Sequence, residues 1–181
     1  MYSFDEILTA YRRQVRIPWR PDAPPSARIW ILWHTPSMHL RITGRIGEFE
    51  DATRQAGHGW ASLDLSPFFG RWIANHEMFE PLIEMPQEVK GLLPQFETAV
   101  CDKVMEGISA TGPNDVLALQ GCGSLFGLAK LSPILDRVSH AIPGRLLVLF
   151  PGKHASGIYR LLDARDGWNY HAVPIPPDPL P

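Results

Sequence analysis

A glycine-rich segment directly follows the apolar run Val116–Gln120, where a ligand loop of an open α/β sheet would lie. A phosphate-binding P-loop carries Lys and then Ser or Thr directly after its last glycine, since these side chains reach the phosphates and Mg²⁺. Here Leu128 and Ala129 occupy those positions, and the glycine spacing also departs from that of a dinucleotide-binding loop. We therefore expect the glycines to permit tight turns, with a degenerate nucleotide-binding or hydrolytic loop as the alternative. The residues of this candidate ligand loop are Gly121, Gly123, Ser124 and Gly127.

Two side chains in the same segment, Cys122 and Ser124, are potential nucleophiles. A nucleophile elbow needs glycine two residues before and two residues after its nucleophile, and neither side chain has this flanking pair. The seven histidines lack the paired spacing that places two metal ligands on one helix face. His76-Glu77, in particular, lacks the second His of a zincin helix. We therefore expect no catalytic residue, no metal and no cofactor.

The densest cluster of charged and aromatic residues lies near the C-terminus. Arg and Trp are frequent anchors of protein interfaces, which favours a partner-binding surface. Ion pairs at turns are also common and individually weak, which favours a purely structural turn. Both interpretations stay open. The candidate partner-binding residues are Arg160, Asp163, Arg165, Asp166 and Trp168.

Alternating strands and helices are expected to position these candidates. Apolar runs predict strands at Arg28–Trp33, Trp60–Leu65, Val116–Gln120, Arg145–Phe150 and Trp168–Ile175. Helical spacing and caps predict helices near residues 4–15, 37–56, 66–73, 93–108 and 132–142. This alternation predicts a three-layer α/β/α sandwich with a mostly parallel sheet of about five strands. We expect a P-loop-NTPase-like or Rossmann-like topology without the nucleotide-binding motifs, in one domain (1–175) followed by a Pro-rich tail (176–181).

Three local patterns are more specific. Ser3 and Glu6 predict a capping box at the start of the first helix. Prolines predict a bend over Glu80–Pro86. The segment Tyr159–Asp163 fits either a single helical turn or the first arm of a hairpin that closes near Asp166-Gly167.

The composition of the 181 residues is that of a soluble globular protein, with 45% hydrophobic and 20% charged residues. The net charge of −2 favours neither nucleic acid nor membrane as a partner. A basic run that could contact DNA is more simply a solvated helix face. Two cysteines, no signal-peptide pattern and no membrane-length apolar run predict a cytoplasmic protein. The basic run comprises Arg12, Arg13, Arg16 and Arg20.

Several motifs together resemble one family. The C-terminal motifs are GSLFG (Gly123–Gly127), RLLVLFPG (Arg145–Gly152) and YRLLDARDGWNYHAVPI (Tyr159–Ile175). The upstream motifs are IPWRP (Ile17–Pro21), GEFE (Gly47–Glu50) and GHGW (Gly57–Trp60). These motifs are similar to those of BrxB, a component of the BREX bacteriophage-exclusion systems, and the resemblance extends from Tyr2 to Ile175.

The resemblance implies an accessory role rather than a catalytic one. BrxB-like proteins are small subunits that work with PglZ, a large partner with an alkaline-phosphatase-like domain. The implied function is therefore to bind PglZ, and other BREX components, in support of phage restriction and host DNA modification. The resemblance transfers no catalytic residue to this sequence and leaves a homodimer open. The chain departs from the family at Cys122 and at Lys153–Gly157, and neither departure falls on a motif residue that defines the resemblance.

Overall fold

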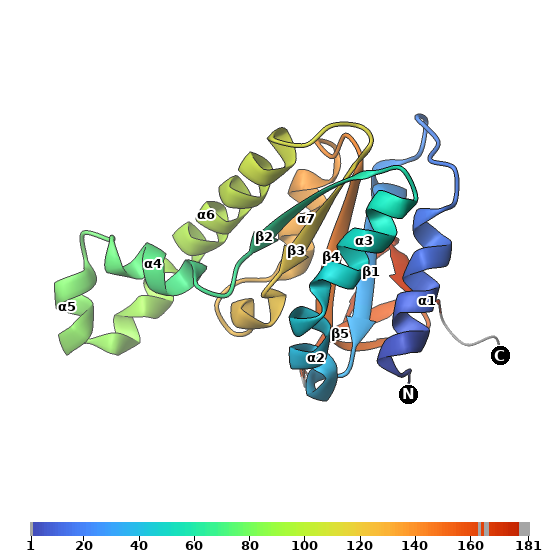
Figure 1. The fold of residues 1–181 in the computed structure, drawn as a ribbon. Coiled ribbons are helices and arrows are strands. Elements are labelled where there is room, and N and C mark those ends of the chain that lie inside the picture. Colours follow the sequence, from blue (N-terminus) through green and yellow to red (C-terminus); the bar gives the residue numbers. More distant parts are fainter. Residues whose placement is uncertain (1, 163, 165–166, 178–181) are drawn as a thin grey trace.

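The computed structural model describes residues 2–162, 164 and 167–177, and they form a parallel sheet covered by helices on both faces (Figure 1). The strands are β1 (Ile29–His34), β2 (Gly59–Asp64), β3 (Asp115–Gln120), β4 (Arg145–Ala155), β5 (Ile158–Leu161), β6 (Trp168–Asn169) and β7 (Val173–Ile175). The order of the parallel strands is β2-β3-β4-β1-β7. The predicted α/β class and three-layer sandwich are therefore confirmed.

The strand order distinguishes between the two expected topologies. Numbered along the chain, the five parallel strands run 5-1-4-3-2 across the sheet. The Rossmann dinucleotide-binding fold has the order 3-2-1-4-5-6, so the sheet departs from it. The Rossmann alternative of the sequence-based expectation is therefore not observed.

The carboxyl half of β4 differs from the prediction of a strand that ends at Phe150. The strand continues to Ala155 and turns back as the antiparallel strand β5, which pairs in turn with β6. Gly152 therefore lies inside a strand, where a Cβ would collide with the carbonyl oxygen of Arg160 on β5. Within the described residues the sheet thus has seven strands rather than about five. The hairpin alternative for the segment that begins at Tyr159 is confirmed.

Helices from different parts of the chain cover the two faces of the sheet. One core cluster joins β1 and β4 to α1 (Phe4–Val15), α2 (His39–Gly44) and α3 (Ile46–Gln55). The other core cluster joins the strand side chains on the opposite face of the sheet to α6 (Val89–Ser109) and α7 (Leu131–Ser139). The predicted capping box of Ser3 and Glu6 is present. The single helix predicted over 37–56 is split at Arg45, whose φ of −117° and ψ of 25° interrupt the helix.

The chain segment that connects β2 to β3 forms a helical arm, which projects away from the sheet (Figure 1). It consists of α4 (Phe68–Ala74), α5 (Phe79–Glu84) and the start of α6. The bend predicted over Glu80–Pro86 is wrong for its first part, because α5 accommodates Pro81 in its first turn. Proline is tolerated there since its missing N–H would have no helical partner. No described helix is long and apolar enough to cross a membrane.

The first two residues of the Pro-rich tail are attached to the body of the protein. The indole Nε1 of Trp33 donates to the carbonyl oxygen of Pro176 at 2.8 Å. The hydroxyl of Tyr2 donates to the carbonyl oxygen of Pro177 at 3.1 Å. These bonds join both ends of the described chain at one edge of the sheet, next to β7 and α1.

Candidate functional site

The candidate ligand loop begins with a glycine that has no space for a side chain. Gly121 has a left-handed φ of 73°, which an L-residue rarely adopts. A Cβ at this position would collide with the backbone nitrogen of Ser66 and lie 2.6 Å from Oδ1 of Asp64. The glycine therefore allows the end of β3 to pack against the end of β2, as the tight-turn interpretation predicts.

Hydrogen bonds inside the loop occupy donors that a phosphate group would need. The backbone N–H of Ser124 donates to the carbonyl of Gly121 at 2.9 Å, and that of Phe126 donates to Gly123 at 3.2 Å. The one hydroxyl hydrogen of Ser124 is shared between the carbonyl of Gly121, at an oxygen–oxygen distance of 2.7 Å, and that of Leu65, at 3.2 Å. A phosphate-binding nest directs successive free N–H groups outward. The geometry of Gly121–Ser124 therefore argues against phosphate binding.

Cys122 is buried below this loop and is not suited to nucleophilic attack. Its side chain has no exposed surface, and burial raises the pKa of the thiol to about 12. The thiolate is the reactive form of cysteine, so the side chain stays protonated and unreactive at neutral pH. Cys122 packs as a small apolar side chain in the core cluster of α6 and α7.

A histidine pair lies at the end of β1, and the sequence did not predict it. His34 donates from Nδ1 to the carbonyl of Leu32 at 3.3 Å, so its Nε2 accepts from Nδ1 of His39 at 3.1 Å. Burial lowers the pKa of His34 to about 4. Burial also lowers the pKa of His39, although the nearby charge of Asp64 acts in the opposite direction. Both rings are therefore neutral at pH 7. The pair has a five-residue spacing with a 3₁₀ turn between the rings, a pattern that no helix or strand periodicity indicates.

A metal site is not formed around this pair. Across the described ranges, no group of three or more His, Cys, Asp or Glu side chains is placed to hold a metal ion.

An open groove beside the loop brings together residues from both sets of sequence-based candidates. It has a volume of about 800 Å³ and lies between the first half of α6, the loop that leads into α7, and the β5–β6 hairpin. Gly127 and Trp168 both line it, whereas Gly121, Gly123 and Ser124 do not. Arg160 is exposed on β5 and lies against Gly167, another lining residue. Asp163, Arg165 and Asp166 lie outside the described residues.

The lining of the groove is mainly apolar and aromatic. Phe126 is 46% exposed, which is unusual for a phenylalanine, and it projects from the loop that precedes α7. Trp168 is held by edge contacts with Phe150 and Tyr170, at ring-centroid distances of 6.0 Å and 5.4 Å. The remaining apolar lining residues include Leu93, Pro94, Leu128, Leu131 and Leu161.

Charged side chains mark the edge of the groove on its helix side. Lys90 and Glu97 come from α6, and Lys130 comes from the end of the loop. The carboxylate of Glu97 accepts a hydrogen bond from the backbone N–H of Lys130 at 3.1 Å, which ties the loop to α6. The groove thus combines a preformed apolar floor with a few charges, the usual composition of an interface core and its rim.

Residues from three of the upstream and C-terminal motifs meet at the end of the sheet where β2 and β4 begin. The ring of Trp19 stacks on His58 at 3.7 Å, and the guanidinium of Arg145 lies 4.6 Å from the Trp19 ring. His58 also hydrogen-bonds Asn114 at 2.7 Å. This stack joins the starts of β2 and β4 to the segment after α1, so these motif residues have a structural role.

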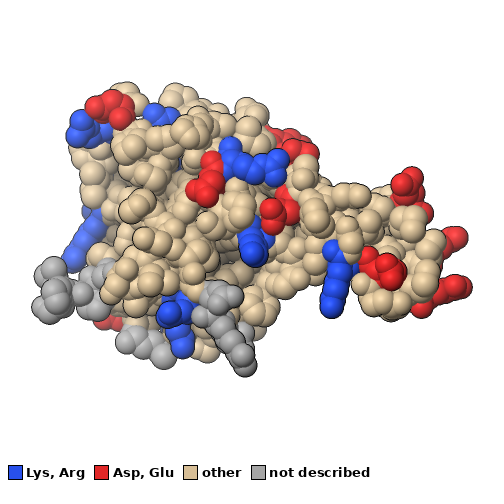
Figure 2. All heavy atoms as spheres, turned by 180° about the vertical axis from the view of Figure 1, so that it is seen from behind, with Lys and Arg blue, Asp and Glu red and all other residues tan. Residues whose placement is uncertain are grey.

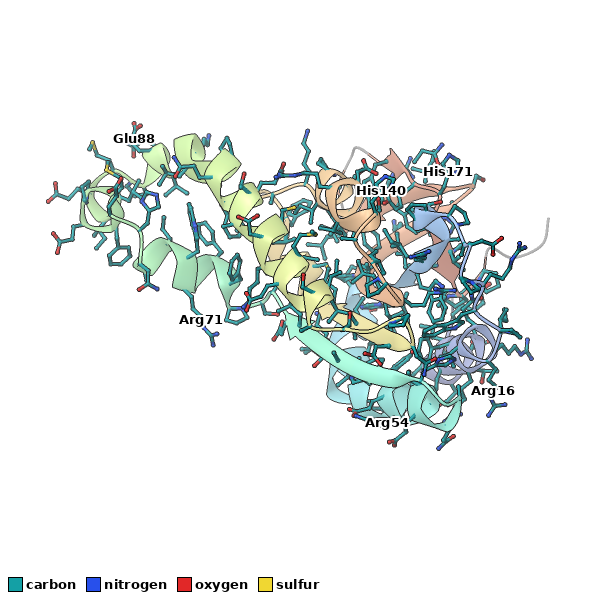
Figure 3. The ribbon with its side chains drawn as sticks, turned by 90° about the horizontal axis from the view of Figure 1, so that it is seen from above. Arg16, Arg54, Arg71, Glu88, His140 and His171 are labelled. Atoms are coloured by element: carbon teal, nitrogen blue, oxygen red, sulfur yellow. The ribbon has the colours of Figure 1, made fainter. Side chains whose placement is uncertain are left out.

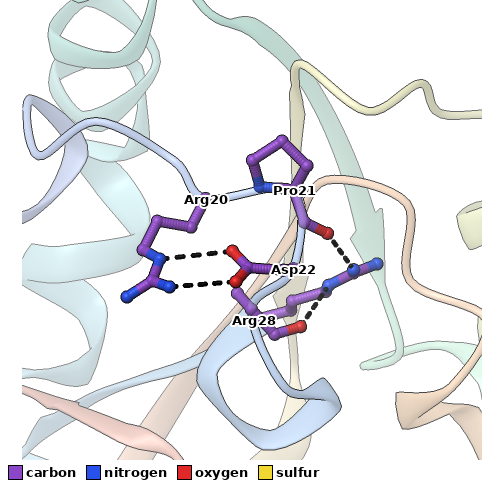
Figure 4. Close-up of polar contacts among 5 residues, drawn as sticks. Arg20, Pro21, Asp22 and Arg28 are labelled. Carbon is purple, nitrogen blue, oxygen red and sulfur yellow. Dashed lines mark hydrogen bonds and ion pairs between the residues drawn. The ribbon is translucent and has the colours of Figure 1, made fainter.

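Part of the basic run is engaged in the same region (Figure 4). Arg20 forms a two-bond pair with Asp22, at 3.2 Å and 2.9 Å. Arg28 donates to the carbonyls of Pro21 at 2.9 Å and Ala23 at 3.2 Å, which closes this loop. Arg20 is therefore partly neutralised, and the continuous basic face that DNA binding would need is weakened.

A smaller cavity of about 370 Å³ lies between α7 and the strand that precedes β7. His140 and His171 line it and are both exposed (Figure 3). Asp136 and Tyr170 line it as well, and burial raises the pKa of the Tyr170 hydroxyl.

Comparison of the chain with protein-family models, with curated proteins and with solved structures gives no match.

Proposed function

We propose that this chain is a BrxB-like accessory subunit of a BREX system and that it binds PglZ without catalysing a reaction itself. The proposal rests on the motif resemblance from Tyr2 to Ile175 and on one structural observation. That observation is the apolar groove lined by Phe126 and Trp168, which joins the GSLFG motif to the YRLLDARDGWNYHAVPI motif. Two motifs far apart in the sequence thus contribute to one surface.

The groove suits a protein partner because its aromatic side chains are already held in place. Trp168 is fixed by its ring contacts, and the loop that carries Phe126 is tied to α6 through Glu97. Aromatic groups that lose little freedom on binding are the usual anchors of interfaces. An apolar side chain of PglZ would fill the floor, while Lys90 and Lys130 would face polar groups at the rim.

Co-purification with PglZ, followed by measurement of the dissociation constant, tests this proposal. Phe126→Ala and Trp168→Ala should each weaken binding at least tenfold, which corresponds to about 1.4 kcal/mol. Leu40→Ala is the matched control, because Leu40 is 84% exposed on α2, away from the groove. If both groove variants fold and bind PglZ as tightly as the parent does, the groove is not the docking site.

The alternative function, a degenerate nucleotide-binding or hydrolytic domain, is tested by titration. We expect no saturable heat with ATP, GTP or NAD, with or without Mg²⁺, because the N–H groups of Ser124 and Phe126 are already bonded within the loop. Saturable binding would favour the alternative over the accessory role.

A further inference from the structure

The end of the helical arm exposes four large apolar side chains to solvent. Met78 is 44% exposed, Phe79 37%, Ile83 64% and Met85 47%. Phe79 and Ile83 are one turn apart on α5 and therefore lie side by side on the same face. Contiguous exposed apolar side chains of this size indicate an interaction surface. Methionines favour such a role, because their flexible side chains adapt to a partner.

Glutamates surround this apolar stripe. Within the described arm, Glu77, Glu80, Glu84 and Glu88 are all exposed, and none forms an ion pair. No Lys or Arg occurs between Arg71 and Lys90. Figure 2 shows acidic side chains gathered at the end of the projecting arm, and Figure 3 places Glu88 there, well away from the sheet. The whole molecule has a net charge of only −2, so this end concentrates the negative charge.

The base of the arm is well packed, which makes its end a preformed surface. Phe96 of α6 contacts Phe68, Phe69 and Trp72, with ring centroids 5.9 Å, 5.0 Å and 5.2 Å away. Leu82, on the inner side of α5, is only 6% exposed. The exposed side chains of α5 are therefore held outward by a packed base.

We propose that the end of the arm binds a basic amphipathic helix of a partner protein. The apolar stripe of Phe79 and Ile83 would contact the apolar face of that helix. Glu80 and Glu84, one turn apart beside the stripe, would face its Lys or Arg side chains. Charge complementarity selects this partner over nucleic acid and acidic membrane, both of which the glutamates repel. None of the four exposed apolar residues lines the groove, so the proposal does not depend on the function proposed above.

Fluorescence anisotropy with a synthetic peptide tests the proposal. The probe is a fluorescein-labelled amphipathic helix of about 18 residues, with leucines along one face and lysines on the other. We expect saturable binding that weakens as salt is added. Ile83→Ser and the pair Glu80→Lys/Glu84→Lys should each raise the dissociation constant at least tenfold. A second peptide with glutamate in place of lysine should bind at least tenfold more weakly than the first.

Matched variants separate the arm from general effects of charge and hydrophobicity. Leu40→Ser removes an exposed apolar side chain from α2, and Asp51→Lys/Asp102→Lys makes the same change in net charge at exposed helical sites. Both controls should bind the lysine peptide as the parent does. Equal binding by the arm variants and the parent would overturn the proposal. So would self-association of the parent that Ile83→Ser abolishes, because it would assign the surface to a second copy of the chain.

Discussion

The carboxyl edge of the sheet has two neighbouring regions with opposite properties. We name the first the closed centre, and it comprises His34, Gly121, Cys122 and Ser124. We name the second the open flank, and it comprises Phe126, Gly127, Lys130 and Trp168, which line the groove. The closed centre uses its polar groups in bonds to its own backbone, whereas the open flank exposes apolar surface. Substitutions in the closed centre should therefore change stability, and substitutions in the open flank should change binding.

The largest expected effect is that of Gly121→Ala, which tests how tightly the closed centre is packed. The left-handed backbone alone costs an alanine about 1–2 kcal/mol, and the collision with Ser66 adds to it. We expect a loss of about 3 kcal/mol or more in the free energy of unfolding, measured in urea. Gly127→Ala is the control, since its φ of 76° is similar but no atom lies within 4 Å of its Cβ. Equal losses in the two variants would show that Gly121 is not constrained by packing.

The second effect is the pH dependence that buried His34 confers. Its pKa is about 4 in the folded protein, against an ordinary histidine value of 6.5, so the unfolded chain binds a proton first as the pH falls. Stability is therefore full above pH 6.5 and decreases by about 3 kcal/mol between pH 6.5 and pH 4. Urea unfolding across this range should show a shallower decrease for His34→Gln than for the parent. Ser62→Ala, which changes no titratable group and lies at an exposed position, should keep the parent's pH dependence.

A smaller effect is expected for Ser124→Ala, which removes the hydroxyl whose one hydrogen the Gly121 and Leu65 carbonyls share. A hydrogen bond contributes about 0.5–1.5 kcal/mol, and both carbonyls lose their donor in this variant. Thermal unfolding should report a loss of about 1–2 kcal/mol. Ser62→Ala, at an exposed position of β2, should leave the transition unchanged. A Ser124→Ala variant as stable as the parent would mean that these bonds do not hold the loop.

The smallest effect on stability is expected in the open flank. Phe126→Ala should change the free energy of unfolding by about 0.5 kcal/mol or less, because surface substitutions rarely cost more. The neighbouring Leu125 is only 1% exposed, so Leu125→Ala should cost about 2–5 kcal/mol. Comparing the two losses of unfolding free energy shows whether Leu125 belongs to the core and its neighbour Phe126 to the surface. A large loss for Phe126→Ala would place it in the core and remove it from the docking surface.

The sequence predicted most of the secondary structure of the body but less of the arm. In α1, the predicted capping box of Ser3 and Glu6 is confirmed, and helical spacing places Phe4, Ile7, Leu8, Tyr11 and Val15 on its buried face. The start of α6 was predicted at Leu93, but the helix begins at Val89. Pro94 lies inside this helix, and proline ordinarily indicates an end or a kink. Packing of Phe96 against α4 is a tertiary contact that no local pattern contains.

The candidate site was only partly accessible to the sequence. Gly127 and Trp168 were both identified as candidates, but nothing in their separate segments indicated that they line one groove. Phe126 was missed because a phenylalanine beside a strand end is usually buried, and its exposure depends on how the loop meets α6. The His34–His39 pair was missed because the two rings face each other across a 3₁₀ turn.

By itself, the sequence determined the α/β class, the strands β1 to β4 and the expectation that Gly121 serves a tight turn. These features depend on the spacing of apolar residues, on capping and on backbone freedom, which are properties of short segments. The strand predicted over Trp168–Ile175 was wrong as one strand, because β6 pairs with β5 and β7 pairs with β1. Only the tertiary structure decided the strand order, the continuation of β4 through Gly152 and the separation of a closed centre from an open flank. The physical reason is that these features depend on contacts between residues far apart in the chain. Gly152 shows this most directly, because its lack of a side chain makes room for a strand that the chain forms only after turning back.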